Sequence, residues 1–462
     1  MSSQLSRKYG LFTAICMVVG IVIGSGVFFK AQTILQKTGG NMPMGIVAWL
    51  IGGAIMLVCL LTFSMMGQKY ERVNGLVDYA EATVSPRYGY SMGWFCATVY
   101  FPAMTSVLAW LSARYTLEFI TSAFPAFPMT IPAAEGGCNV GPECMALALF
   151  YLCMVYGMNA LSPKLAGKFQ TSTTVIKMIP LGLMAVVGLI VGLVSGRMQE
   201  NFVTVAQVET VVDNPLLASV CATAFAYEGW IIATSINAEI KDSKKNLPKA
   251  LIIGGIIIVA TYLFYYIGVS GGASNQDLID KGAPVAFTNI FGGFLGNVLN
   301  LFIAISCLGT TNGLMLGCTR CMYSLAARGE GPAPKVFSRV DEATNMPTNS
   351  AIFALMVTGA WFLYFYLTNL AGTWSGPFAF DSSELPIITV YLMYLPMLIQ
   401  WMRKEKEQNL WRRFVLPSLA LCGSVFMVAA CVLSHKMGCV WYLILFAVIM
   451  AIGLLADKSR KK

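Results

Sequence analysis

Charged side chains are scarce in this sequence. Only 11% of its 462 residues are Asp, Glu, Lys or Arg, whereas 57% are hydrophobic. Soluble domains carry about 25% charged residues, so this balance excludes an ordinary soluble globular protein and indicates that lipid is the solvent. Histidine is nearly absent, because His435 is the only one. A histidine-based metal cluster or catalytic triad therefore cannot be built from this chain.

The sequence also lacks a polar stretch long enough to fold as a soluble domain. Its longest polar connections are 125–142, 196–213, 272–287 and 370–384. The apolar segments offer no nucleophile–base arrangement and no ring of polar residues along one segment. We therefore expect neither an enzyme nor a channel, and we expect no cofactor and no metal. Any activity must reside among the apolar segments.

What the sequence does contain is a series of apolar stretches of about 20 residues, each long enough for a helix to cross about 30 Å of hydrocarbon. Helices satisfy their own backbone hydrogen bonds in lipid, so we predict an all-α polytopic membrane protein. The first stretch is too long for a signal peptide and is expected to be retained. The twelve predicted transmembrane helices are 11–35, 43–67, 90–124, 143–162, 172–195, 214–240, 249–271, 288–326, 349–369, 385–402, 413–433 and 438–456.

Basic residues are distributed asymmetrically between the two sides of the predicted membrane. If the N-terminus is cytoplasmic, 24 of the 31 Lys and Arg residues fall in inner loops or at inner helix ends. This asymmetry follows the positive-inside rule and explains the net charge of +9 without a nucleic-acid partner. Both termini are therefore predicted to be cytoplasmic, in agreement with an even number of spans. The basic residues expected outside are Lys30, Lys37, Arg197, Lys281 and Lys436.

The first span contains three consecutive weak helix formers, Gly24-Ser25-Gly26, in the stretch "IVIGSGVFF". They permit either close helix packing or a broken helix. Span six contains Gly229 next to Glu228 in "FAYEG". A pair of Gly-interrupted spans at corresponding places is typical of an inverted-repeat transporter. The predicted repeats are about 9–196 and 213–403, with two added helices at about 412–457, all within one transmembrane domain of residues 1–462.

A break at these places would expose chemistry suited to an α-amino acid. Unwinding at Gly24-Ser25-Gly26 leaves backbone N–H groups and the positive end of a helix dipole facing mid-membrane, which favours a carboxylate. Unwinding of span six at Phe225-Ala226-Tyr227 would free carbonyl oxygens that accept from an ammonium group. The predicted substrate-binding residues are Ile23, Gly24, Ser25, Gly26, Phe225, Ala226, Tyr227 and Glu228.

Charges within the spans are few, and each is costly unless it is paired or faces water. Arg114 and Glu118 are four residues apart and predict a local ion pair. Glu239 is expected at the membrane interface. Lys177, in "TTVIKMIPL", and Glu228 lie deep in apolar sequence, so both are candidate functional residues facing the bundle interior.

The stretches "GIVIGSGVFF", "FAYEGW…NAEIKDSKKNLPKAL" and "GTTNGLMLGCTRCMYSLAARGEGP" resemble the amino acid–polyamine–organocation (APC) superfamily. The chain is most similar to the L-type amino acid transporters and their bacterial relatives, over roughly residues 9 to 455. The resemblance implies a leucine-transporter-like fold with an inverted five-plus-five repeat, broken helices one and six, and alternating access. It also implies sodium-independent amino acid transport, usually as an obligatory exchanger.

The resemblance also implies roles for individual residues. Gly24–Gly26 would bind the substrate carboxylate, Phe225–Tyr227 would take the ammonium group through backbone carbonyls, and Phe225 would act as an aromatic gate. Lys177 matches the span-five lysine whose ammonium replaces the sodium ion of related sodium-coupled carriers. The implied neighbours of this ammonium are Ser306, Thr310 and Thr311.

Glu228 departs from the small residue often found at this position in transporters of neutral amino acids. It could meet a cationic substrate side chain, titrate in proton coupling, or serve as a structural partner for a backbone N–H or for Lys177. A proton-coupled amino acid or polyamine symporter is therefore an alternative to an exchanger, and a non-transporting amino acid sensor is another. The substrate class stays open.

The thirteen cysteines fall mostly inside spans, where cysteine behaves as a small hydrophobe. Cys138 and Cys144 share an outer loop, where they could form a disulfide or remain two free thiols. Eukaryotic members of the resembling family join a heavy chain through a cysteine of this loop, but two cysteines six residues apart suggest an internal bridge. With its short ends, the chain resembles bacterial members, so we expect an inner-membrane protein without a heavy-chain subunit.

Overall fold

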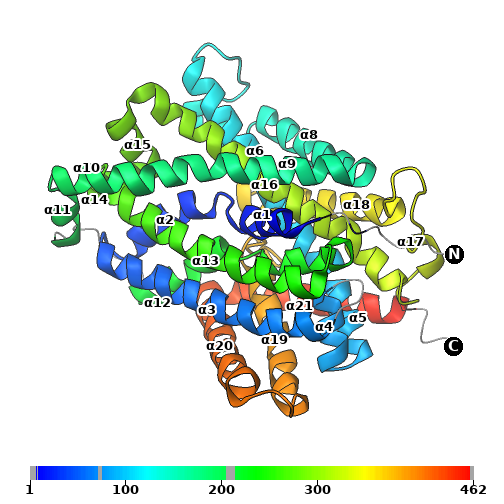
Figure 1. Cartoon of the computed structure of the whole chain (residues 1–462). Helices are drawn as coiled ribbons and strands as arrows, with labels where there is room; N and C mark the ends of the chain where they lie inside the picture. The colour runs from blue at the N-terminus through cyan, green and yellow to red at the C-terminus, as the bar shows by residue number, and fades with distance from the viewer. Residues whose placement is uncertain (1–6, 8, 71–74, 204–213, 458–462) are drawn as a thin grey trace.

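The computed structural model describes residues 7, 9–70, 75–203 and 214–457, and these residues form an assembly of helices (Figure 1). The only extended pairings in these ranges are two isolated bridges, one of which joins Tyr9 to Ile240. The α-helices are α1 (Leu11–Val22), α2 (Gly26–Lys37), α3 (Met42–Lys69), α4 (Gly75–Thr83), α5 (Pro86–Phe95), α6 (Phe101–Ala123), α7 (Gly137–Val140), α8 (Pro142–Leu161), α9 (Pro163–Leu183), α10 (Leu189–Val194), α11 (Arg197–Val203), α12 (Pro215–Tyr227), α13 (Ser243–Ser270), α14 (Asn275–Lys281), α15 (Ala283–Phe291), α16 (Gly293–Ala326), α17 (Pro334–Phe337), α18 (Thr348–Phe365), α19 (Leu385–Lys404), α20 (Leu416–His435) and α21 (Met437–Ala456).

Short segments of other helix types continue or link several of these helices. Two are 3₁₀-helices, η2 (Ala133–Glu135) and η4 (Trp230–Glu239). The other four are π-helical turns, η1 (Cys96–Tyr100), η3 (Met184–Gly188), η5 (Tyr366–Leu370) and η6 (Trp411–Val415).

Twelve helical spans in the described residues are long and apolar enough to cross a membrane, which confirms the predicted number. Their boundaries differ in places from the predicted ones. The fifth span begins at Lys164 rather than at 172, and the eighth begins at Gly293 rather than at 288. The eighth span starts later because α15 ends at Phe291 and Gly292, whose φ is 86°, turns the chain before α16 begins.

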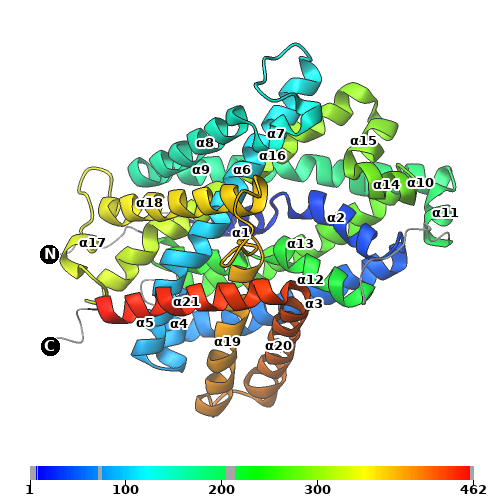
Figure 2. The same cartoon turned by 180° about the vertical axis from the view of Figure 1, so that it is seen from behind.

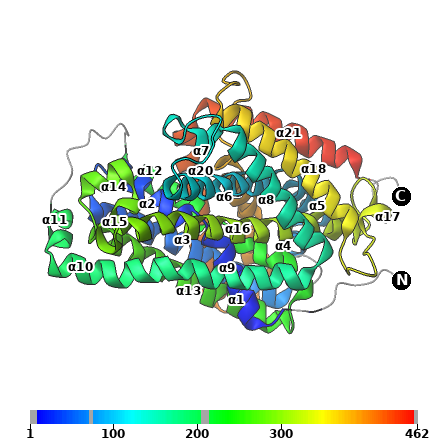
Figure 3. The same ribbon diagram turned by 90° about the horizontal axis from the view of Figure 1, so that it is seen from above.

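Burial separates the spans into a central group and an outer group. The most apolar stretches of spans one, three, six and eight are 78%, 89%, 83% and 78% buried by the rest of the protein. The corresponding stretch of the last span is only 17% buried. Viewed from above, α9 lies along one side of the molecule and α18 and α21 lie along the other (Figure 3). The two spans with predicted breaks therefore lie inside the bundle, where lipid cannot reach their exposed backbone groups.

Span one is broken where its glycines predict a break. Helix α1 ends at Val22 and α2 begins at Gly26, with Ile23 in an extended conformation between them. Span six is also interrupted, but the predicted unwinding at Phe225–Tyr227 is wrong. These residues still belong to α12, and the chain leaves the helix at Glu228, which is extended, and Gly229, whose φ is 105°. The break lies two residues later because only glycine adopts this φ without strain.

The start of the first helix and the end of the last helix lie at the same end of the bundle. Helix α1 begins and α21 ends at the same end of the molecule, as an even number of spans requires (Figure 2). At this end Tyr9 joins the residues that follow span six. Its N–H donates to Glu239 O at 3.0 Å, and its carbonyl accepts from Lys241 N at 2.9 Å. The start of span one is thus tied directly to the end of span six.

Candidate functional site

The two broken spans meet at a cavity in the middle of the bundle. It measures about 370 Å³ with its opening and is lined from span one by Gly24, Ser25 and Gly26 and from span six by Phe225 and Glu228. Five of the eight predicted binding residues thus share one cavity. Ile23, Ala226 and Tyr227 do not line it. The other lining residues are Ile21, Val22, Tyr100, Met104, Leu108, Gly229, Thr310 and Leu314.

The N-terminus of α2 presents donors to this cavity. The first hydrogen bond of α2 runs from Phe29 N to Ser25 O at 2.9 Å. The N–H groups of Gly26, Val27 and Phe28 precede it and have no acceptor within the helix. The hydroxyl of Ser25 is buried and has no hydrogen-bond partner among the described residues. Unpaired donors at a helix N-terminus favour an anion such as a carboxylate.

Close contact between the two breaks explains why residue 26 is a glycine. A Cβ placed on Gly26 would lie 2.8 Å from Ala226 Cα, which is closer than side chains tolerate. Glycine therefore lets the start of α2 pack directly against the end of α12. As a result, the N-terminus of α2 lies directly against the last turn of α12.

Tyr262 of α13 connects the two breaks. Its hydroxyl lies 2.8 Å from Ala226 O and 3.1 Å from Val22 O, and it donates to one of them at a time. Tyr227 points away from the cavity, since its hydroxyl donates to Trp49 O at 3.0 Å. The sequence analysis missed Tyr262. The tyrosines in this otherwise apolar span are the feature of the sequence that could have indicated it.

Glu228 is only partly satisfied. Its Oε1 accepts a hydrogen bond from the hydroxyl of Tyr100, whereas its buried Oε2 forms no well-aligned hydrogen bond in the described ranges, although the Tyr391 hydroxyl and the Gly229 N–H also lie near the carboxylate. It forms no ion pair with Lys177 there, so that structural alternative does not apply. Tyr100 ends the π-helical turn η1, a distortion common at functional sites. No feature of the local sequence signals this turn.

Lys177 of α9 is fully buried and well satisfied. Its Nζ donates to Gly20 O at 2.8 Å, to Ser306 O at 3.0 Å, and to Ile23 O. The Oγ1 of Thr310 lies 3.4 Å away. The lysine therefore links the break in span one to Ser306 and Thr310 of α16.

Thr311 does not join this group. Its hydroxyl donates instead to Cys307 O of its own helix at 2.8 Å. The threonine hydroxyl reaches back one turn because the side chain points along α16 rather than towards α9.

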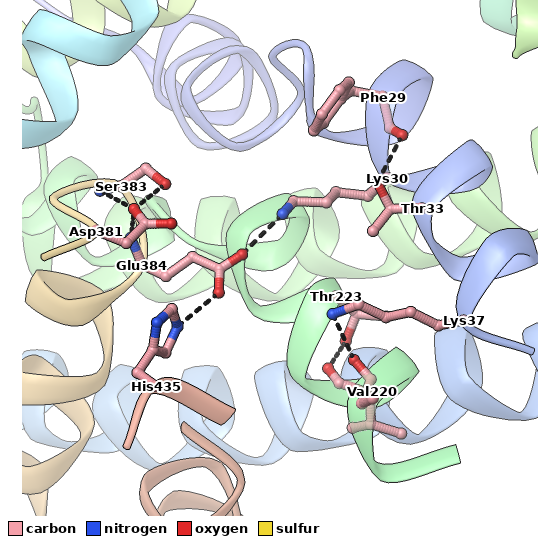
Figure 4. Close-up of polar contacts among 11 residues, drawn as sticks. Phe29, Lys30, Thr33, Lys37, Val220, Thr223, Asp381, Ser383, Glu384 and His435 are labelled. Carbon is pink, nitrogen blue, oxygen red and sulfur yellow. Dashed lines mark hydrogen bonds and ion pairs between the residues drawn. The ribbon is translucent and has the colours of Figure 1, made fainter. Parts of the chain in front are cut away.

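A second cavity, of about 700 Å³, lies on the other side of Phe225, which lines both cavities. Lys30 reaches over Phe225, with its Nζ 5.2 Å from the ring centroid. It also donates to Glu384 at 2.8 Å, and Glu384 contacts His435 at 3.0 Å (Figure 4). The hydrogen bond that His435 donates to the Glu384 carboxylate raises the pKa of His435. Burial alone would raise the pKa of Glu384, but Lys30 and His435 outweigh burial and hold it well below its usual value.

Ion pairs close the opposite end of the bundle. Glu239 lies beyond the end of span six at Thr234, and there it is buried and accepts from Arg320 at 2.5 Å. The side chain of Arg328 pairs with Asp78 and Glu81. The local ion pair of Arg114 with Glu118 is confirmed at 2.7 Å.

The cysteines form no disulfide bond in the described residues. Cys138 and Cys144 are buried free thiols, which corresponds to the second of the two alternatives. Cys318 and Cys321 are also buried and free.

A cavity between two interrupted helices, with the free donors of α2 on one side and Phe225 and Glu228 on the other, is the arrangement of a membrane carrier. The sequence matches the model of the amino acid permease family over residues 9–455, and the chain belongs to this family. Members of the family are transporters rather than enzymes.

The relatives that match the chain carry names of amino acid transporters. The serine/threonine exchanger SteT of Bacillus subtilis is 26% identical over 94% of this chain and 93% of its own length. The mouse Asc-type amino acid transporter 1 is 24% identical, and the mouse large neutral amino acids transporter small subunit 2 is 26% identical. Both mouse alignments cover 74% of this chain and 62% of the relative.

Proposed function

We propose that this protein is a sodium-independent amino acid exchanger that works by alternating access. The observation that carries the proposal is the single cavity shared by both helix breaks. In it the unpaired N–H groups of α2 and the Ser25 hydroxyl suit a carboxylate. The last carbonyls of α12, together with Glu228, suit an ammonium group. These two features recognise the part that all α-amino acids share.

Sodium independence is supported by Lys177. Its ammonium is held by backbone carbonyls of span one and α16, which are hard oxygen ligands of the kind that also bind metal cations. A fixed positive charge at this position makes a mobile cation unnecessary for holding the break in place.

Alternating access is supported by barriers on both sides of the central cavity. Phe225 separates the central cavity from the outer one. On the other side, the Tyr9 backbone contacts and the Arg320–Glu239 pair join the spans. Phe225 is thus a thin barrier on one side of the central site, and the contacts of Tyr9 and Arg320 form a thicker barrier on the other side. Two such barriers can open alternately.

The proposed topology places both termini in the cytoplasm of a bacterium, with the protein in its plasma membrane. The charge asymmetry supports this orientation. We also propose two inverted repeats, at about 9–196 and 213–403, with two added helices, and no heavy-chain subunit. The relative SteT matches this chain over nearly its whole length, whereas one mouse relative is named a small subunit.

The proposal is tested by counterflow in proteoliposomes. Vesicles preloaded with an unlabelled amino acid should take up labelled amino acid several-fold faster than empty vesicles, with or without sodium. A competition panel of neutral, cationic and anionic amino acids and polyamines then defines the substrate. Equal uptake by loaded and empty vesicles would overturn exchange, and a strict sodium requirement would overturn the role of Lys177.

A second candidate, proton-coupled symport, is favoured by the unpartnered Oε2 of Glu228. It predicts uptake into empty vesicles driven by an imposed pH gradient, lost in Glu228→Gln. The matched control is Glu118→Gln, which removes a carboxylate engaged in a local ion pair. Tight amino acid binding without any flux would instead indicate a sensor.

A further inference from the structure

A third cavity opens at the end of the bundle where α1 and α9 begin. It measures about 1110 Å³ with its open mouth and shares no lining residue with the central cavity. Figure 3 shows α1 beside α9 at this place. The lining residues used below are Arg7, Thr13, Lys164, Lys168, Ser172 and Lys241, and no carboxylate lines the cavity in the part of the chain that the structure describes.

The lysines of this cavity have no carboxylate partner among the residues that the structure describes. Lys164, Lys168 and Lys241 form no ion pair with a carboxylate in the described ranges, whereas Arg320 and Arg328 at the same end of the bundle are paired. Like charges around one opening repel one another and attract an anion. The first turn of α9 adds the positive end of its helix dipole.

The surroundings of the cavity distinguish a lipid from a soluble anion. Lys168 and Ser172 lie on the face of α9 that continues through Val175, Ile179 and Leu183, whose side chains are 53%, 46% and 46% exposed. The basic residues lie where the spans begin, at the level of lipid headgroups, and the exposed apolar stripe runs from there into the membrane. A soluble anion would make no contact with this apolar stripe.

We propose that this basic pocket binds the phosphate headgroup of an anionic phospholipid, whose acyl chains lie along the apolar stripe of α9. Basic pockets between transmembrane helices provide the charge complementarity that such headgroups need. The cavity also includes Tyr9 and Lys241, whose backbones are hydrogen-bonded at 2.9 Å. A bound lipid would therefore contact both the start of span one and the end of span six.

The test is native mass spectrometry of the full chain in a neutral detergent, titrated with dioleoylphosphatidylglycerol or dioleoylphosphatidylcholine. The test variant is Lys164→Gln/Lys168→Gln. The matched control is Lys244→Gln/Lys245→Gln, which removes the same charge from exposed lysines at the same end of the bundle that do not line the cavity. Lys241→Gln provides an independent variant of the same pocket. Circular dichroism in lipid-free detergent checks that each variant is folded.

We expect the wild type and the control to bind phosphatidylglycerol at least tenfold more tightly than phosphatidylcholine, and the test variant to lose roughly tenfold in affinity. Lys241→Gln should lose severalfold. An equal loss in the control would show a general effect of surface charge and overturn the pocket. Displacement of the lipid by inorganic phosphate at millimolar concentration would overturn the lipid in favour of a soluble anion.

Discussion

Two of the charges buried within the spans, Lys177 and Glu228, differ in how completely their polar atoms are hydrogen-bonded. Lys177 is surrounded by three carbonyls and a hydroxyl, which use every proton of its ammonium. Glu228 lines the central cavity with one oxygen bonded to Tyr100 and the other without a partner. A fully satisfied charge stabilises one arrangement of the chain, whereas a half-satisfied one is available to a ligand or a proton. Lys177 therefore serves to hold the site together, whereas Glu228 is placed to interact with the substrate or with a proton.

The substitution expected to have the largest effect on this difference between the two charges is Lys177→Met. The substitution keeps much of the side-chain volume but leaves several buried carbonyls without a donor. Breaking such a buried network costs about 3 kcal/mol or more, so we expect a lower thermal midpoint and roughly 100-fold slower transport. Thermal unfolding and counterflow measure the two effects, with exposed Lys245→Met as the control. Near-normal activity would show that the charge is dispensable.

Glu228→Gln should have the reverse pattern. It keeps an acceptor for Tyr100 and removes a costly buried charge, so the thermal midpoint should stay unchanged or rise. Apparent substrate affinity should fall about tenfold, or about 1.4 kcal/mol, because the free oxygen no longer attracts a cationic group. Binding isotherms and thermal scans of the same sample provide the two readouts. A loss of stability matching that of Lys177→Met would remove the distinction between the two residues.

Tyr262→Phe tests the contact between the two breaks with a smaller change. Loss of the hydroxyl removes one hydrogen bond to Ala226 O or Val22 O, which should cost about 1 kcal/mol and slow transport about fivefold. Tyr266→Phe is a matched control on the same helix, because the buried Tyr266 hydroxyl has no hydrogen-bond partner among the described residues. Counterflow rates that fall equally in both variants would contradict a specific role for Tyr262.

The smallest effect is expected at His435, a charge near solvent rather than in the core. Its pKa is raised by Glu384, so their ion pair stabilises the folded protein below about pH 6.5 and is lost as the pH rises through the raised pKa. The thermal midpoint should therefore fall between about pH 6 and pH 9, by an amount equivalent to at most about 1 kcal/mol. His435→Gln should flatten this part of the profile. An unchanged slope in that variant would assign the titration to another group.

Much of the fold was predictable because the membrane imposes strong local rules. Span number follows from apolar length, and the break in span one follows from three weak helix formers in a row. The burial of Lys177 follows from its position deep in apolar sequence. The break in span six was placed two residues early because Gly229 decides where α12 ends, and a glycine in sequence does not reveal the sign of its φ.

Contacts between distant residues were not predictable. Tyr100 meets Glu228 across 128 positions, and Arg320 meets Glu239 across 81. Tyr262 reaches Val22 across 240 positions. Each contact depends on the rotation of one helix about its axis relative to another, and uniformly apolar spans carry little periodicity from which that rotation can be read.

The sequence by itself determined that this chain is a twelve-span helical membrane protein with an interrupted first span and two costly charges at depth. Local composition decides these features, because the hydrocarbon penalises every unpaired polar group. The tertiary structure alone decided which charge is satisfied. Lys177 finds acceptors because the break in span one and Ser306 of α16 both present carbonyls to α9, and the Tyr100 hydroxyl bonds just one of the two oxygens of Glu228.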